Sequence, residues 1–181
     1  MAHMQFTLVT GNPGKLAEFK RLLPKDITFD HHELDLEEIQ SLDNNEIVTA
    51  KVKAAYAELH CPVIVEDVTA GLDELGGLPG PFIKFFEKQM GYDALYKLRG
   101  QTAATVVCTI GYYDGSNLLL ASGTVHGQTV AQRGEFGFGF DACFMPDGQT
   151  KTFAEMPPQE KDAVSHRSIA VADLMTQFKR L

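Results

Sequence analysis

Residues 63–86 read VIVEDVTAGLDELGGLPGPFIKFF and pass from an apolar run to an acidic pair, a glycine-rich loop and a basic helix. The opening Val-Ile-Val is β-branched, which predicts a strand covered on both faces of an α/β sheet. Glu66 and Asp67 follow at the expected carboxyl end of that strand, where ligands gather in such sheets. The acidic pair could therefore hold a Mg²⁺ ion or activate a water, and a solvated acidic loop or a helix cap is the alternative.

The loop at 76–81, GGLPGP, combines three glycines with two prolines. Glycine leaves backbone donors uncovered and proline fixes the backbone at two points, so a bulky anion can approach the chain here. Pro81 is expected to begin the next helix. Lys84 then lies one turn in, within reach of a phosphate near the helix N-terminus. The phenylalanines that follow have helical spacing and predict core packing.

The length of 181 residues and the hydrophobic content of 44% suit one domain with a sizeable core, or two lobes that share a cleft. We expect a single two-lobed domain over 1–181, in which residues 1–3 are a cloning remnant. The formal net charge of -8 argues against a surface that binds nucleic acid polymers. Basic residues that converge on one site would therefore be informative.

The three cysteines, Cys61, Cys108 and Cys143, are far apart and show no zinc-finger spacing. This pattern predicts reduced thiols and a cytoplasmic protein. The sequence has no apolar run as long as a membrane span and nothing that resembles a signal peptide. We therefore expect no membrane partner.

The segment at 10–15, TGNPGK, lies between a predicted strand at 5–10 and a predicted helix at 15–23. A strand, a glycine-rich turn and a helix that opens with lysine is the form of a phosphate cradle. A Walker A loop is excluded, because it needs glycine and Ser or Thr where this chain has valine and leucine. Phosphate binding by backbone amides and Lys15 stays open, and an ordinary βα turn fits equally well.

An acidic run and a helix follow a predicted strand at 27–30. Glu38 lies in this run, most of which is typical of a solvated loop. Asn44 or Asn45 can cap the next helix, which reaches residue 59 and carries Lys51 on the flank of its apolar face. Lys51 is thus free to point elsewhere.

Two strand-like runs, 104–110 and 118–125, are joined around Asp114-Gly115 and predict an antiparallel hairpin. A short helix is expected before them at 92–98. Antiparallel strands after a βα region predict α/β architecture, namely an elongated mixed β-sheet flanked by helices, with two lobes and a central cleft.

Residues 134–141, GEFGFGFD, alternate glycine with phenylalanine before a carboxylate. The glycines allow a flat ligand to approach closely, and a phenyl face can stack on a purine. A β-bulge or sheet corner with aromatic packing explains the same pattern equally well.

The segment at 161–167, KDAVSHR, precedes a predicted C-terminal helix that Ser165 can cap. His166 and Arg167 then lie in the first turn, where cations oppose the helix dipole, which favours a role in ligand binding. A catalytic Ser-His pair is the alternative, but adjacent residues of a helix face different ways.

Six motifs together resemble the inosine/xanthosine triphosphate pyrophosphatase family. They are TGNxxK, the VED strand end, GGLPGPFIKFF, GFGFD, TFAEM at 152–156 and the final SHR, in the family's order and spacing over nearly the whole chain. The resemblance implies a two-lobed α/β fold and a homodimer. It also implies Mg²⁺-dependent hydrolysis of ITP, dITP and XTP to the monophosphate and pyrophosphate, which clears deaminated nucleotides.

The resemblance also implies roles for individual residues. Glu38 and Asp67 resemble the carboxylates that bind metal and activate water, and Lys15 completes the catalytic set. The implied substrate-binding residues are Thr10, Gly11, Asn12, Lys15, Lys51, Lys84, Phe138, Gly139, Asp141, Lys161, Ser165, His166 and Arg167. The first six of these resemble phosphate-binding residues, and the last seven resemble a base-recognition set.

Two other functions stay open. A nucleotide-binding regulator would hold a purine triphosphate without cleaving it, although the presence of both Glu38 and Asp67 argues against this. A P-loop kinase or GTPase is weakened by the failed Walker A pattern.

Overall fold

The structure is a computed structural model that describes residues 5–181, so the proposed cloning remnant at 1–3 lies outside the described residues. Its helices and strands, in chain order, are β1 (Gln5–Val9), α1 (Pro13–Leu22), β2 (Thr28–His32), α2 (Asn44–Leu59), β3 (Val63–Leu72), β4 (Pro79–Gly80), α3 (Ile83–Met90), α4 (Ala94–Arg99), β5 (Ala103–Tyr113), β6 (Leu118–Thr129), β7 (Phe144–Pro146), α5 (Pro158–Asp162) and α6 (His166–Phe178). Three short 3₁₀ helices are η1 (Asp73–Leu75), η2 (Gly139–Cys143) and η3 (Phe153–Glu155).

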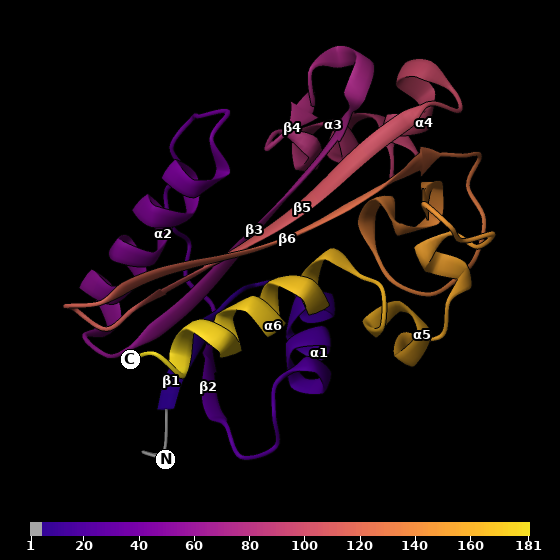
Figure 1. Cartoon of the computed structure of the whole chain (residues 1–181). Coiled ribbons are helices and arrows are strands. Elements are labelled where there is room, and N and C mark those ends of the chain that lie inside the picture. Colours follow the sequence, from indigo (N-terminus) through magenta and orange to yellow (C-terminus); the bar gives the residue numbers. More distant parts are fainter. Residues whose placement is uncertain (1–4) are drawn as a thin grey trace.

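One open, mixed sheet runs through the molecule, in the order β2-β1-β3-β5-β6-β7, with β4 paired to β3. The strands β2, β1 and β3 are parallel, whereas β3, β5, β6 and β7 pair antiparallel. In Figure 1 the long strands β3, β5 and β6 cross the molecule side by side. The predicted α/β fold with a mixed sheet flanked by helices is confirmed, as is the hairpin between β5 and β6.

Helices cover both faces of the first half of β3. Helix α2 packs on one face, while α1 and α6 lie on the other side of the sheet (Figure 1). Val63 and Val65 belong to the core under α2, and Ile64 belongs to the core under α1 and α6. This alternation follows from the two-residue period of a strand, and it confirms the predicted double-sided burial.

The acidic pair lies in the middle of β3, so the prediction that it ends the strand was wrong. Strand β1 pairs with β3 only as far as Ile64, but β5 pairs with β3 along its whole length, and Glu66 lies opposite Ile110. Because β5 stays paired with β3 beyond Ile64, β3 continues as a strand after its pairing with β1 has ended. Glu66 and Asp67 still lie beyond the carboxyl end of β1, next to the turn at 10–12.

A separate core fills the other end of the sheet. It joins the end of β3 and the start of β5 to α4, η2 and η3 through side chains that include Leu72, Leu95, Phe144 and Phe153. The acidic pair on β3 therefore lies between this core and the cores that pack around residues 63–65. The pocket described below opens at that junction.

Helix α3 begins at Ile83 and not at Pro81, which corrects the predicted boundary. Pro79 and Gly80 pair with Gly71 and Ala70 of β3, and the Phe82 amide donates to the Pro79 carbonyl in a turn. The chain is thus held in the sheet for two residues before it can become helical. Within residues 5–181, no helix is both long enough and apolar enough to cross a membrane.

Candidate active site

A pocket of about 570 Å³ is lined by the turn after β1, the loop before α2, the middle of β3, helix α3, η2 and the first turn of α6. This volume falls in the range of sites for small ligands. Every residue of the predicted site lines it except Ser165. The Ser165 side chain instead accepts a hydrogen bond from the Ser168 amide and caps α6, as the sequence also predicted.

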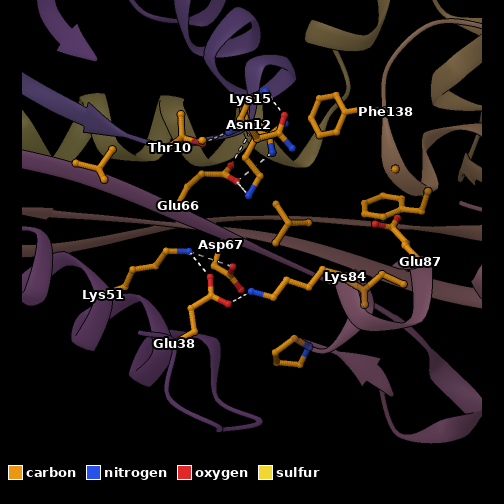
Figure 2. A pocket seen from close by; sticks show the side chains of 18 of the residues that line it. Thr10, Asn12, Lys15, Glu38, Lys51, Glu66, Asp67, Lys84, Glu87 and Phe138 are labelled. Carbon is orange, nitrogen blue, oxygen red and sulfur yellow. Dashed lines mark hydrogen bonds and ion pairs between the residues drawn. The ribbon is translucent and has the colours of Figure 1, made fainter. Parts of the chain in front are cut away.

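Two carboxylates and two lysines form a cluster on one side of the pocket (Figure 2). Lys51 Nζ lies 2.7 Å from Glu38 Oε1 and 3.8 Å from Asp67 Oδ1, and Lys84 also contacts Glu38. Burial raises the pKa of Asp67, although Lys15 and Lys51 oppose this. A carboxylate with a raised pKa is a stronger base than an exposed one.

Glu38 and Asp67 suit a hard divalent cation. Both present carboxylate oxygens, and both contact the same ammonium group of Lys51. Among residues 5–181, no group of three or more His, Cys, Asp or Glu side chains converges on one point. A pair of protein carboxylates is enough for Mg²⁺, which usually keeps several waters and takes its other ligands from substrate phosphates.

The turn at 10–12 uses its polar groups to begin α1. Asn12 Oδ1 accepts hydrogen bonds from the amides of Gly14 and Lys15, and the Asn12 amide donates to Thr10 Oγ1. The amides of Gly14 and Lys15 are thus bonded within the chain, so phosphate binding at this turn would depend on Lys15 and on the remaining amides. Lys15 is the cation that this turn offers, and its Nζ lies 2.6 Å from Glu66 Oε1.

Behind the pocket lies a buried charge network of three cations and three carboxylates. Its members are Lys15, Lys161, Arg167, Glu18, Glu66 and Asp141. Arg167 binds Glu66 with Nε at 2.6 Å and also contacts Glu18. Lys161 Nζ lies 2.7 Å from Glu18 and 2.6 Å from Asp141.

Each buried charge of this network is balanced by an opposite one. Burial alone would raise the pKa of Glu66, but Arg167 and Lys15 hold it well below its usual range. Such pairing is required, because a buried charge without a partner costs several kcal/mol. Burial opposes the charge of Arg167, but Glu66 and Glu18 raise its pKa and so keep its guanidinium charged at the floor of the pocket.

The far end of the pocket is aromatic. The Phe138 ring lies over the charged groups of Lys161 and Arg167, with its centroid 5.0 Å from Lys161 Nζ and 5.7 Å from Arg167 Cζ. The ring also packs so closely on Gly14 that a Cβ there would lie 2.3 Å from it. Phe140 packs near the buried His166, with ring centroids 6.0 Å apart. Burial, Arg167 and Lys161 lower the pKa of His166 well below its usual range, so its imidazole is neutral.

A model of the Ham1 family matches residues 6–177. The chain belongs to the Ham1 family. It is 44% identical over 177 residues to the inosine triphosphate pyrophosphatase of Yarrowia lipolytica, with 94% of each chain covered. It is 39% identical over 171 residues to the inosine triphosphate pyrophosphatase of Schizosaccharomyces pombe, with 92% of this chain and 90% of the relative covered.

Solved Ham1 structures share the fold. The Ham1 protein of Staphylococcus aureus is 26% identical and has a TM-score of 0.81 over 98% of this chain and 99% of its own. A HAM1 protein from Coxiella burnetii, also 26% identical, has a TM-score of 0.82 over 98% of this chain and 100% of its own. The sequence prediction of the family is thereby confirmed.

Two carboxylates of this Ham1 site were not predicted from the sequence. Glu66 was predicted as part of the acidic pair, although the resemblance implied a role only for Asp67. Glu18 lies on α1 and Glu87 on α3, and neither had a sequence signal beyond a charge within an amphipathic helix. Glu87 lines the pocket and Glu18 contacts Arg167 beneath it, because of where the two helices pack.

Proposed function

We propose that this chain hydrolyses the non-standard purine nucleoside triphosphates ITP, dITP and XTP to the monophosphate and pyrophosphate. Such an enzyme clears deaminated nucleotides from the precursor pool. The observation that carries the proposal is one pocket that joins a cluster of lysines and carboxylates to an aromatic end with buried cationic donors. The names of the fungal relatives support the same substrate class.

The lysine-rich side suits a triphosphate. Lys51 and Lys84 contact Glu38, and Lys15 lies nearby on α1, so positive charge surrounds the space next to Asp67. In the proposed reaction, Asp67 positions a water against the α-phosphorus and accepts its proton. The lysines neutralise the charge that develops on the departing pyrophosphate.

Mg²⁺ is the proposed cofactor, held by Glu38 and Asp67. When bound there, it would supply positive charge to the phosphate oxygens. Lys51 contacts both carboxylates, so its ammonium lies beside the atoms that would hold the ion.

The aromatic end suits a 6-oxopurine base. A base stacked on Phe138 would lie close to the buried donors of Lys161 and Arg167. Each terminal nitrogen of Arg167 carries two N–H groups, and the bonds to Glu66 and Glu18 use one on each. The other two N–H groups can donate to the O6 oxygen of hypoxanthine or xanthine. Adenine carries an amino group at the same ring position, which cannot accept these bonds.

The proposal extends to the setting of the enzyme. We expect a homodimer in the cytoplasm, with nucleotides and not nucleic acid polymers as ligands. The net charge of -8 supports the last point, because a polymer-binding surface needs a basic excess.

The test is incubation with ITP, XTP, ATP and GTP, with Mg²⁺ or with a chelator, followed by separation of the products by charge. Monophosphate plus pyrophosphate from ITP and XTP, lost on chelation, is the expected result. Diphosphate plus phosphate would favour a kinase-like or GTPase-like reaction. Binding without turnover would favour a nucleotide-binding regulator.

A further inference from the structure

Glu87 is a half-buried carboxylate that differs from the fully buried ones around the pocket. Its Oε1 atom is buried and, among residues 5–181, that atom has no hydrogen-bond partner, although the Phe140 amide of η2 lies close enough to the carboxyl to lower its pKa. Glu18, Glu66 and Asp141 each bind a buried cation, whereas no cation of the described residues pairs with Glu87. Unpartnered buried carboxyl oxygens are rare, and those in a ligand pocket point to a missing donor.

Helix α3 directs Glu87 into the pocket. Ile83 and Glu87 are four residues apart, so they share one face of the helix, and both line the pocket. Oε1 faces the backbone of η2, where a Cβ on Gly139 would lie 2.9 Å from it. In Figure 2, Glu87 and Phe138 lie at the same end of the pocket, away from Lys51 and Glu38.

The electrostatic surroundings of Glu87 suit a carboxyl that accepts a hydrogen bond from a ligand. Burial raises the pKa of Glu87 to about 7. The Phe140 amide and Lys15 of α1 act to lower it, and Asp141 of η2 acts to raise it. No ion pair fixes its charge, so a hydrogen bond from a ligand can decide its state near neutral pH.

We infer that Glu87 accepts a hydrogen bond from the nucleoside half of the substrate and thereby helps to select it. The inference rests on the proposed function. A phosphate is unsuitable as the partner, because it would bring further negative charge to a carboxyl that already faces Asp141. A nucleoside beside Phe138 offers two donors that differ among purine nucleotides, the ring N–H next to O6 of a 6-oxopurine and the 2′-hydroxyl of ribose. The 3′-hydroxyl is common to ITP, dITP and ATP, so a bond to it could not select among them.

Three substrates separate these donors. ITP has both, dITP lacks the 2′-hydroxyl, and ATP lacks the ring N–H. Glu87→Leu removes the acceptor and introduces an apolar side chain that suits the wall of the pocket. Glu87→Gln keeps an acceptor oxygen. Glu58→Gln, on the exposed side of α2, is the matched control.

The expected result is a loss of about tenfold to hundredfold in kcat/KM for ITP with Glu87→Leu, the scale of one hydrogen bond to a charged group. Glu87→Gln should restore part of it. A loss shared by dITP but not ATP assigns the ring N–H, and a loss shared by ATP but not dITP assigns the 2′-hydroxyl. Equal losses on all three substrates, or no loss, would overturn the inference.

Binding distinguishes a failure of this inference from a failure of the proposed function. Calorimetric titration of the same variants with ITP, dITP and ATP in the presence of a chelator needs no turnover. If the wild type binds ITP without cleaving it, the proposed function fails, and the Kd ratios still decide the role of Glu87. If the wild type cleaves ITP and the ratios do not change, only the role of Glu87 fails.

Discussion

Arg167 on α6 donates two hydrogen bonds to Glu66 on β3, with Nε 2.6 Å from Oε2 and Nη2 3.2 Å from Oε1. Both side chains are 1% exposed. The two residues are 101 positions apart in the chain, so this contact fixes the first turn of α6 on the middle of the sheet. Because a guanidinium and a carboxylate pair through two parallel hydrogen bonds, the contact fixes the relative orientation of the two side chains and also stabilises them.

Glu66→Gln should lower the free energy of unfolding by about 3 kcal/mol, because it leaves the buried charges of Arg167 and Lys15 short of a counter-charge. Urea unfolding measures this. Glu37→Gln, an exposed change of the same kind, should stay within about 0.5 kcal/mol of wild type. Equal stability of the two variants would show that Glu18 and Asp141 balance the network without Glu66.

Asp67→Asn should lower kcat for ITP at least about hundredfold, because the amide keeps the shape of the side chain but cannot accept a proton from water. Steady-state release of pyrophosphate measures it. Asp26→Asn, exposed in the loop after α1, should retain full activity. A near-native rate for Asp67→Asn would remove Asp67 from the mechanism.

Lys84→Ala should raise KM for ITP about tenfold while leaving the affinity for inosine unchanged, since its ammonium is expected to meet phosphate and not the base. The Lys84 side chain is 52% exposed, so its removal should cost little stability. Lys88→Ala on the same helix is the matched control. Similar losses for ITP and inosine would contradict this placement.

Arg167→Lys should narrow the ratio of kcat/KM between ITP and ATP by about tenfold. Lysine keeps the buried positive charge but cannot reproduce the planar fork that holds Glu66 and still offers N–H groups to the base. Thermal unfolding establishes that the variant is folded. An unchanged ratio would show that Lys161 and His166 read the base edge without Arg167.

Glu87 should make stability depend on pH near neutrality. Its pKa of about 7 when folded lies above its usual 4.5, so its favourable contribution is present in acid and is lost as the pH rises from about 4.5 through 7. Glu87→Gln removes this titration. Between pH 5 and 8 the variant should therefore gain on the order of 1 kcal/mol relative to wild type, after allowance for solvent screening.

Unfolding measured at pH 5 and pH 8 checks this, with Glu58→Gln as the control that should follow wild type. Parallel stability curves for Glu87→Gln and wild type would show that Glu87 carries an ordinary pKa.

The sequence predicted which segments meet in the pocket, since the turn at 10–12, the acidic pair, α3, η2 and α6 each carry a local motif. It missed the length of β3, because the continuation of that strand depends on pairing with β5, whose residues come about 40 positions later. It also missed the start of α3, since Pro79 and Gly80 are held by β3 and not by their own neighbours.

Glu18 shows most clearly the limit of predicting the site from the sequence. Its position on α1 is typical of a solvated charge, and its burial depends on Lys161 and Arg167, which lie 143 and 149 residues further along. Glu87 is similar, because its pocket wall is completed by Gly139 and Phe140 from η2. Local periodicity carries no signal for partners that only the tertiary fold brings near.

The buried charge network also limits how this sequence can evolve. Its three cations and three carboxylates come from α1, β3, η2, α5 and α6, so no short segment contains a complete set of partners. A neutral replacement at one position leaves an imbalance that only a second replacement elsewhere can correct. Viable lineages should thus carry these positions unchanged, or carry changes to opposite charges in pairs.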